Sequence, residues 1–159
     1  MNGHETAQFV FTNTQKPSFR LVKLDSYSGL GLAGATFRIA QIEDGSHYLD
    51  RVTDTRGEIN ISDLEPGVYS VFEMDAPEGY VKDSREYHVE LFPGQNSELV
   101  VSNDRMPNLE ILKTDAITGK PVAGVTFTVK RVDSSTLTTV TSDENGRCYL
   151  EKLMPGVYE

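Results

Sequence analysis

Three polar residues of complementary chemistry interrupt apolar strand faces in this sequence: Lys23, Glu73 and Asn103. Each continues a stretch in which apolar and polar residues alternate with period two, the pattern of a half-buried strand. The alternation therefore predicts that a lysine, a glutamic acid and an asparagine all point into the core of one module. The apolar members of the three faces are Phe19 and Leu21, Tyr69 and Val71, and Leu99 and Val101.

This combination of side chains could form a covalent bond. Burying an unpaired charge is costly, so a buried lysine and glutamic acid must pair or become neutral. Desolvation disfavours the charged form of both groups, which allows a neutral amine beside a neutral acid. A neutral Lys23 could attack the amide carbon of Asn103, while a protonated Glu73 polarises the amide carbonyl and then passes its proton to the leaving ammonia. The product would be an isopeptide crosslink between Lys23 and Asn103.

A simpler interpretation remains open for each residue taken alone. Lys23 and Asn103 could lie near strand ends and reach solvent, and Glu73 could be a surface charge. Because all three residues continue the apolar face of their strands, the crosslink is favoured. A slip of one residue in any strand would turn its inward residues outward.

The elements that must position these residues are short strands. Alternating stretches are separated by turn signals such as Ser28-Gly29, Asp44-Gly45 and Pro93-Gly94, and no segment has a helical period. About seven strands at this spacing predict an all-β fold, an antiparallel Ig-like or prealbumin-like β-sandwich. Residues 53–57 are expected to form a hairpin turn in which Gly57 has a positive φ.

Much of the sequence occurs twice at a spacing of 90 or 89 residues, which indicates an array of like modules. We predict the last strand of a preceding repeat at 1–16, a complete module at 17–107 (the first module), and a truncated second copy at 108–159 (the second copy). Asn13 matches Asn103, and Lys113 matches Lys23, but neither flank holds a full trio, so no internal bond is expected in either. The matching segments are 9–13 with 99–103, 16–25 with 106–115, 33–37 with 123–127, and 66–69 with 155–158.

Composition narrows the functional classes. The net charge is −9 with the acidic residues scattered, which argues against nucleic acid or an anionic membrane as partner. No apolar run has the length of a membrane span, and the first residues do not resemble a signal peptide. Cys148 is the one cysteine and aligns with Ile59, so we expect a small buried apolar side chain rather than a disulfide.

No cofactor or metal site is expected. His4, His47 and His88 are the three histidines, and none has metal-binding or nucleophile spacing, which argues against a turnover enzyme. Residues 142–146, the counterpart of 53–57, resemble a calcium loop but lack its full ligand set, so a plain turn is favoured.

Two segments resemble a known family: residues 23–37, with Lys23-Leu24-Asp25 and Ala33-Gly34-Ala35-Thr36-Phe37, and residues 64–80, with Pro66-Gly67-Val68-Tyr69 and Pro77-Glu78-Gly79-Tyr80. They are similar to the collagen-adhesin B-type, or SpaA-like prealbumin-like, domains of Gram-positive surface proteins and pilins. The resemblance implies an extracellular stalk or spacer on the cell wall. It also implies that Lys23 is the nucleophile, Asn103 the acceptor and Glu73 the catalytic acid of a self-formed bond.

Partners follow from this interpretation. Neighbouring repeats of the same protein are expected to contact the module through a short linker that contains Pro107, and a host extracellular protein could bind through other regions. The alternative function is a ligand-binding β-sandwich without a crosslink, in which exposed Tyr27, Tyr48 and Tyr80 would contact a host protein or glycan.

Overall fold

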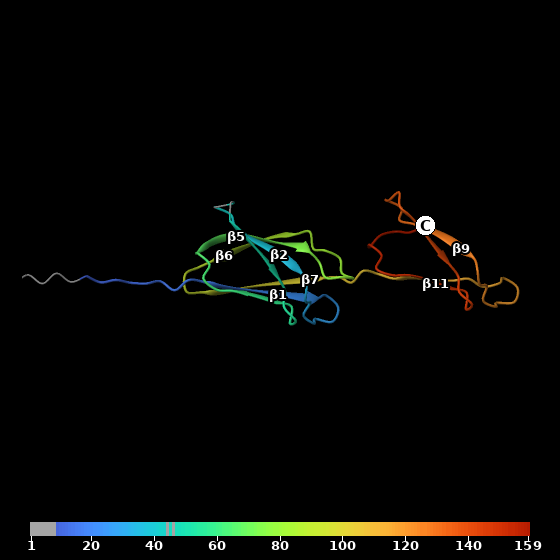
Figure 1. Ribbon diagram of the computed structural model, residues 1–159, viewed down its shortest axis with the longest axis horizontal. Helices are drawn as coiled ribbons and strands as arrows, with labels where there is room; N and C mark the ends of the chain where they lie inside the picture. Colours follow the sequence, from blue (N-terminus) through green and yellow to red (C-terminus); the bar gives the residue numbers. More distant parts are fainter. Residues whose placement is uncertain (1–8, 44, 46) are drawn as a thin grey trace, which may run out of the picture.

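The chain is all-β in the computed structural model, which describes residues 9–43, 45 and 47–159. The first module and the second copy follow one another along the long axis of the molecule (Figure 1). The His4 and Asp44 assignments of the sequence analysis lie outside the described residues. The strands are β1 (Ser18–Asp25), β2 (Thr36–Gln41), β3 (Tyr48–Val52), β4 (Glu58–Ile61), β5 (Gly67–Asp75), β6 (Glu86–Leu91), β7 (Asn96–Asn103), β8 (Leu109–Leu112), β9 (Thr126–Lys130), β10 (Leu137–Thr141) and β11 (Arg147–Leu150).

The first module is a sandwich of two sheets, as the alternation predicts. One sheet has the order β4-β1-β7 and the other β3-β2-β5-β6. Neighbouring strands are antiparallel except β1 and β7, which run parallel with Lys23 opposite Val101 and Asp25 opposite Asn103. Because the first and last strands run in the same direction, the chain enters the module at one end and leaves it at the other.

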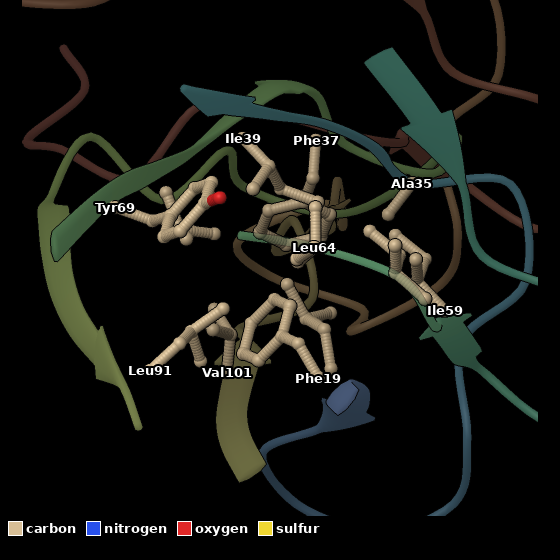
Figure 2. Close-up of a cluster of buried hydrophobic side chains, with 12 residues drawn as sticks. Phe19, Ala35, Phe37, Ile39, Ile59, Leu64, Tyr69, Leu91 and Val101 are labelled. Atoms are coloured by element: carbon tan, nitrogen blue, oxygen red, sulfur yellow. The ribbon is translucent and has the colours of Figure 1, made fainter. Parts of the chain in front are cut away.

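The core lies between these two sheets. Apolar side chains from β1, β4 and β7 meet those from β2, β5 and β6, with Leu64 from the connection after β4 among them (Figure 2). Phe37, Leu21 and Val71 are fully buried, and the residues on either side of Phe37 and Leu21 are more exposed. The predicted strand phase is therefore confirmed, and burial of these side chains is the main source of the module's stability.

The hairpin predicted at 53–57 is wrong, because β3 and β4 belong to different sheets. The segment instead crosses from one sheet to the other. The predicted positive φ of Gly57 is confirmed at 78°. A Cβ at this residue would lie 2.4 Å from the Lys23 carbonyl oxygen. Only glycine fits this approach of the turn to β1.

The second copy has fewer strands. β11 pairs with β8, β10 pairs with β9, and a bridge joins Arg131 to Tyr158. Cys148 is buried as expected, but most side chains of β8, β9 and β10 are partly exposed because the described chain has no counterparts of β6 and β7 to cover them.

Residues 9–16 were expected to include a strand, and none forms there. Phe9 and Phe11 are exposed, which fits a segment with no neighbouring strand to pair with in the described chain.

Candidate functional site

The three residues singled out by the alternation meet inside the first module. Lys23, Glu73 and Asn103 are 0%, 1% and 2% exposed. Lys23 lies on β1 and Asn103 at the end of β7, its parallel neighbour in the same sheet. Glu73 comes from β5 in the opposite sheet. The site therefore needs the first strand, the last strand and the facing sheet to assemble together.

The polar atoms of the trio form a closed set of contacts. Lys23 Nζ donates a hydrogen bond to Asn103 Oδ1 and lies 3.3 Å from Glu73 Oε1. Asn103 Nδ2 donates to Glu73 Oε1 at 2.9 Å and to Oε2 at 3.0 Å. The amine is thus beside the amide carbonyl, and the carboxyl group is beside the amide nitrogen.

This arrangement corrects one detail of the sequence analysis. Glu73 was expected to bond to the amide carbonyl of Asn103, but that oxygen accepts from Lys23 and Glu73 contacts the amide nitrogen instead. The carboxyl group is placed where a leaving nitrogen would need a proton. Lys23 and Asn103 come from neighbouring strands of one sheet, whereas Glu73 reaches the amide from across the core.

The surroundings favour a neutral amine. Burial lowers the pKa of Lys23, and the nearby Glu73 opposes this shift without cancelling it. The Phe37 ring, whose centroid lies 5.5 Å from Lys23 Nζ, is part of the apolar wall that keeps water away. A lysine in this setting has more of the unprotonated form that acts as a nucleophile.

Two neighbouring groups were missed by the sequence analysis. The main-chain N–H of Asp83 donates to Glu73 Oε2 at 2.7 Å, and no feature of the sequence predicts this contact. Asp25 is buried and accepts hydrogen bonds from Arg105 Nε at 2.6 Å and Tyr80 OH at 2.8 Å. Asp25 lies two residues after Lys23, so the same alternation could have placed it inward.

The flanking residues do not form a second trio. Asn13 is exposed on a segment without strand structure, and Lys113 is partly buried just after β8. The main-chain N–H of Lys113 donates to Gly146 at 2.7 Å, as that of Lys23 does to Gly57 at 2.7 Å. The second copy thus reproduces the backbone around the lysine without the acid and the amide.

Other candidate residues have ordinary surroundings. Asp143 Oδ1 accepts from the main-chain N–H of Asn145 and Arg147, both at 2.8 Å, as in a plain turn. Tyr27 is 91% exposed and Tyr48 54%, whereas the Tyr80 hydroxyl is bound to Asp25.

Over residues 9–43, 45 and 47–159, no group of three or more His, Cys, Asp or Glu residues could hold a metal ion. No helix in the same residues could cross a membrane.

The fold and the buried trio define a prealbumin-like β-sandwich with a polar site between its first and last strands. The family model described as the SpaA prealbumin-like fold domain matches residues 17–105 and again residues 107–159. Because these matches cover most of the sequence, the chain belongs to this family, and the resemblance stated from the sequence is confirmed. Comparison with curated protein sequences finds no match.

The chain is similar to several solved structures of bacterial proteins. The Bacillus anthracis TIE protein is 26% identical with a TM-score of 0.57, and the match covers 86% of this chain and 26% of that one. A streptococcal ancillary pilin is 24% identical with a TM-score of 0.58, covering 92% and 53%. A mutant of the shaft pilin SpaA from Lactobacillus rhamnosus GG is 16% identical with a TM-score of 0.53, covering 92% and 85%. The chain thus spans about a quarter of the first protein and about half of the second.

Proposed function

We propose that this chain is a stalk or spacer segment of a Gram-positive surface protein, and that its first module closes itself with an isopeptide bond between Lys23 and Asn103. The observation that carries the proposal is the buried contact of Lys23 Nζ with the Asn103 amide, with Glu73 on the other side of that amide. An amine, an amide and an acid in contact in a dry core are the reactants and the catalyst of amide exchange.

The reaction needs no cofactor. The lone pair of a neutral Lys23 Nζ attacks Asn103 Cγ, forming the new C–N bond. Glu73 gives its proton to Asn103 Nδ2 and receives one from Nζ, so the carboxyl group ends as it began. The bond from Cγ to Nδ2 breaks and ammonia leaves. The first module reacts once, so the chain is a structural protein and not a turnover enzyme.

A bond at this position would suit a stalk. It joins β1, where the chain enters the module, to β7, where the chain leaves it, so a pulling force passes through the crosslink and bypasses the rest of the sandwich. It also closes a loop across a sequence separation of 80 residues. By analogy with a disulfide, closing a loop of that size lowers the entropy of the unfolded chain. This stabilises the folded module by roughly 4 to 5 kcal/mol. Unlike a disulfide, the bond cannot be reduced.

The extracellular location and the partners are part of the same proposal. The family assignment and the pilins of similar fold support a place on the bacterial surface. Neighbouring modules of the same protein are the expected partners. Lys152 of the second copy forms an ion pair with Glu78 of the first module, a contact that supports an end-to-end arrangement.

Intact-mass measurement of the denatured chain tests the proposal. The wild-type chain should be lighter than its sequence by the mass of one ammonia, and Glu73→Ala should restore the full mass. Glu90→Ala is the matched control, because Glu90 lies exposed on β6 and should leave the deficit unchanged. Recovery of separate, unmodified tryptic peptides carrying Lys23 and Asn103 from the wild-type chain would overturn the proposal.

A further inference from the structure

One main-chain group outside the trio reaches the catalytic carboxyl group. Glu73 Oε2 accepts a hydrogen bond from the main-chain N–H of Asp83 at 2.7 Å. Asp83 lies in the loop between β5 and β6, which runs beside the end of β7. With Oε2 held by this N–H, Oε1 is directed at both reacting nitrogens, Lys23 Nζ at 3.3 Å and Asn103 Nδ2 at 2.9 Å.

The position of that N–H depends on the Asp83 side chain. Its carboxylate accepts from Arg85 Nε and Nη2, both at 2.9 Å, and from Tyr87 OH at 2.7 Å. The Asp83 side chain is 7% exposed. Burial alone would raise the pKa of Asp83, but the hydrogen bonds from Arg85 and Tyr87 bring it down to about 2. Asp83 is therefore an anionic anchor that fixes the loop to β6.

The same loop is also attached to the end of β7. The main-chain N–H of Val81 donates to the Asp104 carbonyl at 2.8 Å, directly after the reacting Asn103. A recess of about 300 Å³ lies between the loop and this strand end, lined by residues 81–85 and 102–104. The recess reaches Asn103, whose amide nitrogen is the leaving group in the proposed reaction.

We propose that Asp83 is the positioning residue of the crosslinking site: its carboxylate anchors the loop, its main-chain N–H orients Glu73, and the adjacent recess lets ammonia escape. This role rests on the proposed function. It differs from a general role in folding because the Asp83 contacts set where a carboxyl oxygen lies relative to two reacting atoms. Small displacements of a catalytic group slow a reaction strongly even when the fold is intact.

Timed cell-free synthesis of the full 159-residue chain, quenched in denaturant and followed by intact mass, measures the rate of ammonia loss. Asp83→Ala should slow crosslinking by about tenfold or more, because the loop loses its anchor. Asp83→Asn should recover part of the rate, since its side-chain oxygen can still accept from Arg85. A purely steric role for the side chain would instead give Asp83→Asn the wild-type rate, because asparagine has nearly the shape of aspartate, and that result would overturn the role of an anionic anchor.

Two tyrosines provide a matched pair of milder variants. Tyr87→Phe and Tyr80→Phe each remove one hydroxyl, but only the Tyr87 hydroxyl contacts Asp83, whereas that of Tyr80 contacts Asp25. Tyr87→Phe should slow crosslinking by about threefold and Tyr80→Phe should leave the rate unchanged. This pair decides the question if Asp83→Ala does not fold, which hydrogen exchange of β1 and β7 would reveal.

The outcomes separate this role from the proposed function. If the wild-type chain loses ammonia and the Asp83→Ala and Tyr87→Phe chains lose it at the same rate, Asp83 has no positioning role and the crosslink stands. Equal slowing by Tyr87→Phe and Tyr80→Phe would also overturn the role, because it would show a general effect of the loop. A wild-type chain that never loses ammonia overturns the crosslink and with it the role of Asp83.

Discussion

The first module and the second copy build the same backbone around a lysine and give it different surroundings. In the first module the Leu32 N–H donates to the Lys23 carbonyl at 2.8 Å, and in the second copy the Val122 N–H donates to the Lys113 carbonyl at 3.0 Å. Yet Lys23 is fully buried and Lys113 is only partly covered. The main-chain hydrogen bonds around the lysine are the same in both regions, whereas the chemistry of the lysine side chain depends on strands far along the chain.

A second likeness supports this distinction. Thr53 and Ser142 hold equivalent turns through the same two contacts: each hydroxyl donates to a main-chain carbonyl, at 2.7 and 2.8 Å, and each accepts a main-chain N–H at 3.0 Å. Neither turn requires β5 or β7. A buried reactive lysine does, because Glu73 and Asn103 come from those two strands.

The largest effect should come from removing each lysine in turn. Lys23→Ala abolishes the proposed crosslink and removes the group beside the buried Glu73, which should lower the free energy of unfolding of the first module by at least roughly 4 to 5 kcal/mol. Lys113→Ala should change the second copy by no more than about 0.5 kcal/mol, since Lys113 lies outside any such trio. Hydrogen exchange read peptide by peptide along a denaturant series reports each region separately. Equal losses in the two regions would contradict the comparison.

A smaller effect is expected at the glycine that faces each lysine. A Cβ at Gly57 would lie 2.4 Å from the Lys23 carbonyl oxygen, and a Cβ at Gly146 would lie 2.3 Å from that of Lys113. Both glycines also have positive φ. Gly57→Ala and Gly146→Ala should therefore each cost about 2 to 3 kcal/mol locally, because a steric clash adds to backbone strain.

The matched controls are Gly34→Ala and Gly124→Ala, measured by the same hydrogen exchange. These glycines also have positive φ, but no atom lies within 4 Å of an added Cβ. The controls should cost about 1 kcal/mol, the strain of the left-handed backbone alone. If Gly146→Ala behaved like Gly124→Ala, the turn in the second copy would not be packed against its lysine as the turn in the first module is.

Alternation and turn signals were enough to predict the sandwich and the inward phase of the trio, because period two fixes the face of each residue once a strand is assigned. They could not show that β3 and β4 lie in different sheets, since a turn sequence specifies a change of direction and not the partner of the next strand. The Asp83 contact was also beyond prediction. It is made by a main-chain N–H, which every residue except proline has, so the residue type carries no signal.

The aspartate two residues after each lysine should affect stability less than the glycines do, and only at low pH. Hydrogen bonds from the Ser28 N–H, Arg105 and Tyr80 hold the pKa of Asp25 well below its ordinary value. The N–H and hydroxyl groups of Thr118 lower the pKa of Asp115, and the charge of Lys113 adds a smaller contribution in the same direction. A lowered pKa contributes stability above the ordinary aspartate value of about 3.9, and this contribution is lost as pH falls through the folded-state pKa.

The first module should therefore lose stability as the pH is lowered below about 4. Asp25→Asn should remove most of this dependence, because the neutral amide cannot form the ion pair with Arg105. Asp115→Asn should reduce the pH dependence of the stability of the second copy by a smaller amount. Carboxyl titration by NMR should show the pKa of Asp25 below that of Asp115. The reverse order would mean that Arg105, which is itself mostly exposed, adds nothing to the buried carboxylate.

The smallest effect is expected where the two regions touch. Lys152 of the second copy forms an ion pair with Glu78 in the loop of the first module, and their side chains are 53% and 85% exposed. Exposed pairs contribute little because water and salt screen them and both side chains lose freedom. Glu78→Gln and Lys152→Gln, alone or together, should leave both unfolding transitions where they are, with or without added salt. A coupling between the two substitutions that vanished in high salt would contradict this expectation, because it would show that the ion pair links the stability of the two regions.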